Sequence, residues 1–128
     1  MTVSVPVSWG EIIDKITILE IKTEHLVDPV KVTNVQKELD LLVAVREREF
    51  PAHKRLAILS AELKSINQKL WVIEDDIREC ERAKDFGPRF VELARAVYFT
   101  NDARATTKRK INDLLGSELV EEKSYAPY

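Results

Sequence analysis

The sequence predicts an all-α protein, an antiparallel helical bundle or long helical hairpin with heptad packing and a short extended N-terminal arm. Three observations predict it. Charged residues make up 33% of the chain, and only three glycines and five prolines interrupt its 128 residues, which is typical of amphipathic helices. Helix start and stop signals divide the chain into four segments, and one segment carries an unbroken heptad pattern. We expect one helical domain over residues 1–128, with an arm at 1–7 and a tail at 117–128.

The arm and the first helix are predicted by a change of periodicity. Valines alternate with polar residues or proline over residues 1–7, which indicates an extended arm. Ser8 and Glu11 then have the spacing of a capping box, with serine at the N-cap and glutamate at N3. Apolar residues recur every three or four positions behind them. This pattern predicts a helix over about residues 9–26.

Prolines and glycines delimit the second and fourth helices. Asp28-Pro29 starts the second, because aspartate caps a helix and proline suits its first turn. Pro51 ends that helix near the preceding residue. Gly87-Pro88 predicts a loop, and the fourth helix follows over about residues 89–115 until Gly116 ends it.

The third helix, over about residues 52–83, carries the clearest pattern in the chain. Its apolar residues alternate at spacings of three and four, at Leu56, Leu59, Leu63, Ile66, Leu70, Ile73, Ile77 and Cys80. These positions need a packing partner, because burying each large side chain contributes about 1.5–3 kcal/mol. The second helix is the expected neighbour, but it is too short to cover the whole pattern. We therefore expect self-association, most simply as a homodimer.

The fourth helix has polar residues where its apolar face should continue. At heptad spacing, the next positions of that face are Asn101, Arg104 and Lys108. An overlapping row on the same side adds Tyr98 and Asn112, and we call these five residues the polar stripe. Buried side chains of these types are costly unless they are satisfied. Two interpretations stay open. The helix end either emerges into solvent or lines a pocket that binds a phosphate or carboxylate group.

Carboxylates on the first and third helices form candidate metal ligands. Glu11 and Asp14 lie one turn apart, and Glu74 and Asp76 flank the heptad positions. Carboxylates grouped on helices can hold Mg²⁺, so Mg²⁺ is a candidate cofactor at these four residues. The alternatives are ordinary partners of a helix dipole for the first pair and a solvated charge run with a Glu74–Arg78 pair for the second.

Composition excludes several classes of protein. The longest apolar run, residues 41–45, is far shorter than the roughly 18 residues of a membrane span. A net charge of −2 does not indicate the strongly basic composition of a nucleic-acid-binding protein. The single cysteine, Cys80, excludes an internal disulfide and a cysteine-cluster zinc site. We expect a soluble cytoplasmic protein that has no signal peptide and binds neither a membrane nor nucleic acid.

The chain resembles a small uncharacterised all-helical family of bacteria and tailed phages, including phages of marine cyanobacteria. If the chain is phage-encoded, this resemblance implies that the protein is located in the cytoplasm of the host cell. The stretches that carry it are residues 8–16, 73–78, 93–98 and 120–125.

A weaker resemblance is to the MazG-type all-α nucleotide pyrophosphohydrolases. Glu11–Asp14, Glu74–Asp76 and Lys108–Asn112 follow the order of that family's paired acidic motifs and its later lysine and asparagine. The first motif, however, ends in aspartate, and Ile77 stands where the second motif needs a carboxylate. The resemblance implies Mg²⁺ and a nucleotide.

These features favour two functions. The heptad pattern favours a homo-oligomeric assembly or partner-binding module, whose partner could also be a phosphate-bearing small molecule or another protein. The alternative is a Mg²⁺-dependent nucleotide or phosphate-ester hydrolase, with acidic residues on the first and third helices and basic ones on the fourth. Convergence of both kinds of residue in one pocket would favour the enzyme, and dispersal on separate faces would favour the module. The residues concerned are Glu11, Glu74, Asp76, Arg104 and Lys108.

Overall fold

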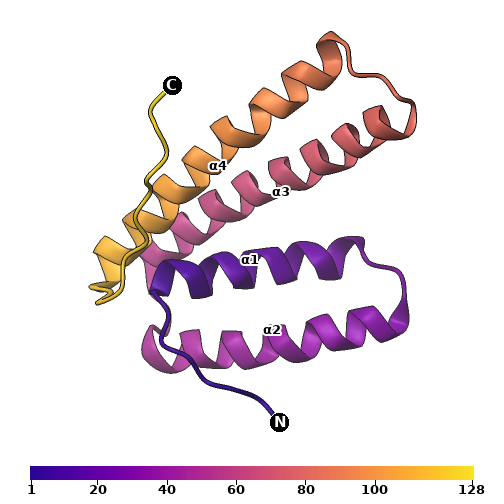
Figure 1. Ribbon diagram of the computed structural model, residues 1–128. Helices are drawn as coiled ribbons and strands as arrows, with labels where there is room; N and C mark the ends of the chain where they lie inside the picture. The colour runs from indigo at the N-terminus through magenta and orange to yellow at the C-terminus, as the bar shows by residue number, and fades with distance from the viewer.

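The computed structural model describes residues 1–128, and it contains four α-helices and no strand (Figure 1). The helices are α1 (Trp9–His25), α2 (Pro29–Glu49), α3 (Lys54–Arg82) and α4 (Pro88–Leu115). They hold 74% of the residues, far above the usual third. The all-α prediction is confirmed, and every helix begins and ends close to its predicted positions. None of the four combines the length and apolar composition that crossing a membrane requires.

The helix ends use the capping residues that the sequence indicates, with one difference. The Ser8 hydroxyl accepts a hydrogen bond from the Glu11 N–H at 3.2 Å, and the Asp28 carboxylate accepts one from Val30. Gly116 ends α4 with a positive φ of 64°, a conformation that costs glycine little. Only half of the predicted capping box forms, because the Glu11 carboxylate binds Lys108 of α4.

The helices form two antiparallel hairpins, α1–α2 and α3–α4, and α1 lies between α2 and the α3–α4 hairpin (Figure 1). α1 packs against all three other helices, and α3 packs most extensively on α4. The prediction that the second helix is the neighbour of the third is wrong, since α2 contacts only α1. The physical reason is length. α4 has 28 residues and matches the 29 of α3, so it covers the heptad positions far better than the 21 residues of α2.

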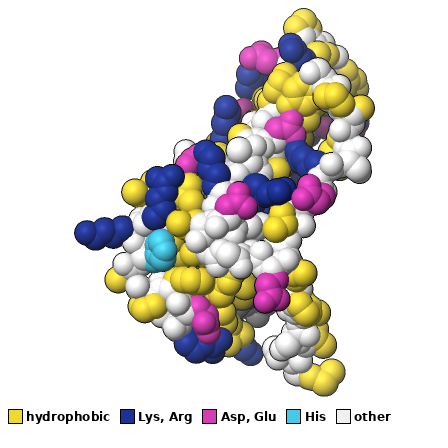
Figure 2. All heavy atoms as spheres, turned by 90° about the vertical axis from the view of Figure 1, so that its left-hand side faces the viewer, with side chains coloured by type: hydrophobic (Ala, Val, Ile, Leu, Met, Phe, Trp, Pro, Cys, Tyr) yellow, Lys and Arg dark blue, Asp and Glu magenta, His cyan; other side chains and the backbone are white.

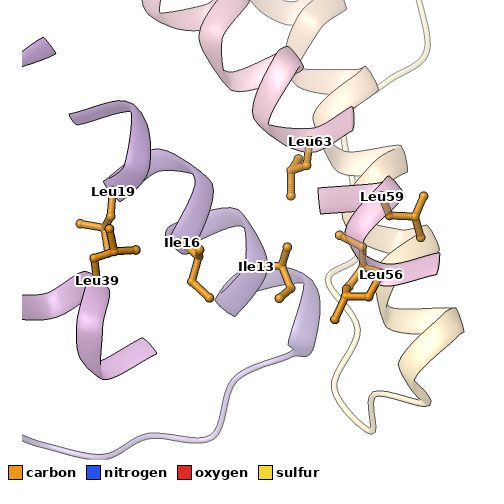
Figure 3. Packing of buried hydrophobic residues seen from close by; sticks show 8 residues of the cluster. Ile13, Ile16, Leu19, Leu39, Leu56, Leu59 and Leu63 are labelled. Carbon is orange, nitrogen blue, oxygen red and sulfur yellow. The ribbon is translucent and has the colours of Figure 1, made fainter. Parts of the chain in front are cut away.

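The main core lies where the two hairpins meet on α1. Figure 3 shows Ile13 directed toward α3 and Leu19 directed toward Leu39 of α2. One side of α1 therefore packs against α2 and the opposite side against the α3–α4 hairpin. Leu63 of α3 is completely buried where the two hairpins meet. The buried cluster consists of Ile13, Ile16, Leu19, Leu39, Leu56, Leu59, Leu63 and Ile111.

The heptad positions of α3 are buried to different degrees. Ile66, Leu70 and Ile77 are only half-buried, whereas the others are buried, Cys80 as a free thiol.

The buried face of α4 includes two residues of the predicted polar stripe, Lys108 and Asn112. Asn101 and Arg104 are half-buried, at the edge of the α4 contact surface. The other buried residues of α4 are Leu93, Thr100, Thr107 and Ile111.

The two ends of the chain lie outside the helices. Residues 1–7 are exposed and carry no regular structure. Residues 117–128, which we call the tail, turn back after Gly116 and run beside α4 (Figure 1). The expected self-association rested on an uncovered end of the third helix. Since α4 accompanies α3 along its length, that reason is removed, and self-association stays a prediction.

Candidate functional site

The N-terminus of α1 meets the C-terminal half of α4 at very close range. The Gly10 N–H donates to the Asn112 side-chain oxygen at 2.7 Å. A Cβ at Gly10 would lie only 2.7 Å from the Lys108 carbonyl oxygen, so the position requires glycine. Asn112, a predicted ligand-binding residue, is buried in this contact between the two helices. It positions α1 and is not available to a ligand.

Asp14 joins three helices through one buried carboxylate. Its side chain is 3% exposed. Arg104 of α4 donates to both of its oxygens, at 3.0 Å and 2.5 Å, and Asn67 of α3 donates to one at 2.9 Å. The hydrogen bond with Asp14 raises the pKa of Arg104. The bidentate pair holds the guanidinium in one orientation.

Lys108 is held between two carboxylates one turn further along α4. The residue is only 7% exposed, and its ammonium donates to Glu11 of α1 and, at 2.8 Å, to Glu121 of the tail. Burial alone would lower the pKa of Lys108, but the hydrogen bonds to Glu11 and Glu121 raise it. The lysine therefore stays charged although it is buried.

A cleft of about 360 Å³ opens beside these pairs. Four of the five predicted ligand-binding residues line it, namely Tyr98, Asn101, Arg104 and Lys108. The polar stripe thus marks a real hollow on α4. Arg104 uses two of its five N–H groups on Asp14. The other three have no protein acceptor, so they are free to donate to a ligand.

The tail forms the outer wall of this cleft. Glu121 binds Lys108, Glu122 binds Arg109 at 3.1 Å, and Lys123 pairs with Asp102 of α4. The Tyr128 hydroxyl also donates to Asp102. Sequence reasoning did not place these tail residues at the site. The only signal for them was the run of acidic residues at 121–122, which is complementary to the basic run at 108–110.

The remaining predicted metal ligands lie elsewhere. Glu74 pairs with Arg78 at 3.5 Å on the exposed side of α3, as the charge-run interpretation expects, and Asp76 pairs with Arg89. Glu74 does line a second hollow of about 560 Å³ that shares Asn101 and Arg104 with the cleft. The structure assembles no group of three or more His, Cys, Asp or Glu side chains that could hold a metal.

Figure 2 shows the face of the molecule at the left of Figure 1, where acidic and basic side chains are interspersed over the surface. The ion pairs of this region follow the same pattern, since every basic residue named above has an acidic neighbour. This face therefore offers local pairs of opposite charge and no extended field of one sign.

Acid is expected to release the tail from α4. Hydrogen bonds to Lys108 hold the pKa of Glu121 below its ordinary 4.5, and hydrogen bonds from Lys123 and Tyr128 hold the pKa of Asp102 below 3.8. A lowered pKa means that docking is at full strength above the ordinary value and is lost as the pH falls through the lowered one. NMR contacts between the Tyr128 and Tyr98 rings, which lie 5.3 Å apart, should persist at neutral pH and be lost as the pH falls below the ordinary carboxyl range. Ring contacts that do not weaken on acidification, with the helices intact, would contradict this.

One family model matches the chain. It is a family of unknown function, DUF6165, and it matches residues 3–127. The chain belongs to this family. The expectation of an uncharacterised family that covers nearly the whole chain is thereby confirmed. No match is found among curated proteins or among solved structures.

Proposed function

We propose that this member of the DUF6165 family is a partner-binding module that recognises an anionic group, a carboxylate or a phosphate, in the cleft on α4. One observation carries the proposal. Arg104 is fixed by Asp14, has three N–H groups without a protein acceptor, and lines the same cleft as the nearly buried Lys108. Tyr98 and Asn101 add neutral polar groups to the lining.

The arrangement suits an anion for physical reasons. A guanidinium whose orientation is already fixed loses little conformational freedom when it binds. Charge-assisted hydrogen bonds to a partly buried cation are stronger than those made in water. Glu121 of the tail supports the interpretation, because its carboxylate already occupies Lys108. One anionic group, the Glu121 carboxylate, therefore already lines the cleft beside Lys108.

The alternative, a Mg²⁺-dependent nucleotide or phosphate-ester hydrolase, finds less support. Glu11 and Asp14 each bind a basic side chain, and Asp76 binds Arg89. These carboxylates neutralise cations and form no group of three or more that could hold a metal. Catalysis by the MazG-type arrangement would need them grouped around a metal. Of the acidic residues proposed for catalysis, only Glu74 borders a hollow lined by Arg104.

Inorganic phosphate and acetate are expected to shift backbone NMR signals of the intact chain mainly between residues 97 and 108. Lys108→Gln should weaken this binding about tenfold or more, because one charged hydrogen bond contributes about 1.5–3 kcal/mol. The matched control is Lys69→Gln, since Lys69 is exposed on α3, and it should bind as the wild type does.

The same titration separates the two functions. Phosphate and acetate that bind without Mg²⁺ would support the module. A response only to a nucleotide together with Mg²⁺, or product formation from one, would favour the hydrolase. Signals that do not move with either anion, or that move equally in the Lys108 and Lys69 variants, would refute the anion site.

A further inference from the structure

The tail places an anionic group, the Glu121 carboxylate, on Lys108, where we expect a ligand of the cleft to bind. We propose that the partner presents an extended peptide segment of acidic and aromatic residues to α4, and that residues 117–128 compete with it from within the chain. This inference rests on the proposed function and names the partner's chemistry. It is carried by three features of the tail contact, which are charge pattern, aromatic packing and weak attachment.

The charges of the tail are complementary to those of the α4 residues that it contacts. Glu121 binds Lys108, Glu122 binds Arg109, and Lys123 binds Asp102. This pattern of two acidic residues and a basic one selects a sequence and not merely a net charge, because a segment shifted by one residue would place like charges together. Inorganic phosphate would satisfy only the cationic part of this surface.

Aromatic side chains form the second part of the recognition. The Tyr128 ring lies 5.3 Å from that of Tyr98 and 4.9 Å from that of Phe99. Arg95 lies over the Phe99 ring at 5.9 Å. Even with the tail in place, Tyr98 and Phe99 are 42% and 46% exposed. Exposed aromatic pairs beside an arginine are typical of protein interaction sites.

The tail is attached weakly enough to be displaced. All its residues from 118 to 128 are exposed, and no backbone hydrogen bond joins them to the helices. The last backbone bond of the chain is from the Ser117 N–H to the Asn112 carbonyl. The ion pairs of Glu122 and Lys123 join exposed side chains, and such pairs contribute little. The tail is therefore held by a few weak contacts and the Glu121–Lys108 pair, aided by its high local concentration.

The charge pattern suggests an experiment with the full chain and a labelled peptide of the sequence of residues 117–128. Fluorescence anisotropy should show saturable binding to the wild type. Weakening the internal competitor with the double substitution Glu121→Gln and Tyr128→Ala in the chain should strengthen peptide binding several-fold. Neither residue belongs to a helix, so folding should not be affected.

A charge exchange tests the register directly. In the double variant, whose own tail competes only weakly, Asp102→Lys should reduce binding of the unmodified peptide several-fold, and a peptide with Lys123→Asp should recover most of it. Glu92→Lys, an equal charge reversal at an exposed α4 position outside the contact, should change neither affinity.

The outcomes distinguish the peptide-binding surface from the simpler anion site. Peptide binding with the expected charge exchange supports the proposal. Phosphate binding at Lys108 without saturable peptide binding, or peptide binding that ignores Asp102, overturns it and leaves the anion site standing. Absence of both phosphate and peptide binding refutes the proposed function as well.

Discussion

Asp14→Ala is expected to destabilise the protein by about 3–5 kcal/mol, because removing one partner of a buried ion pair leaves the other charge uncompensated. The substitution removes both acceptors of Arg104 and the acceptor of one Asn67 hydrogen bond. Arg104 retains some contact with water, since its side chain is 30% exposed, so the lower end of the range is expected. Urea denaturation followed by circular dichroism measures the loss.

A surface ion pair of the same kind provides the control for Asp14. Asp76→Ala also removes a carboxylate from an arginine, but both partners of that pair are well exposed, at 40% and 59%. Its expected effect is below about 1 kcal/mol. Equal losses in the two variants would mean that the bonds of Asp14 to α3 and α4 do not hold the hairpins together.

Leu63→Ala is expected to cost about 2–5 kcal/mol, because it leaves a cavity where the two hairpins meet. Leu63 is 0% exposed and belongs to the cluster that α1 fills from the other side. The same denaturation experiment measures the change in the free energy of unfolding.

Leu70→Ala is the matched control, at another position of the same heptad pattern. Leu70 is half-buried and lines an open hollow, so its truncation removes less apolar contact and should cost clearly less. An equal cost at both positions would contradict the structure, because it would place Leu70 in a closed core.

Local sequence signals were sufficient to predict the helices. Ser8, Asp28 and Gly116 mark helix ends because their effect depends on backbone groups only two or three residues away. The polar stripe on the fourth helix was also readable, since it interrupts a face with a helical period. Four of its residues, Tyr98, Asn101, Arg104 and Lys108, line one hollow, and ligand binding there stays a prediction.

Only the tertiary structure decided which surfaces meet. The sequence offered carboxylates of both the first and the third helix for a site shared with the basic residues of the fourth, but only Asp14 and Glu11 of α1 pair with Arg104 and Lys108. Asn67 supplies the α3 contribution to this polar site, and the tail closes it through Glu121. The physical reason is that caps and periodicity depend on neighbours along the chain. Pairing of α3 with α4 and docking of the tail depend on shape and charge matches between distant segments, and several such matches are compatible with one sequence pattern.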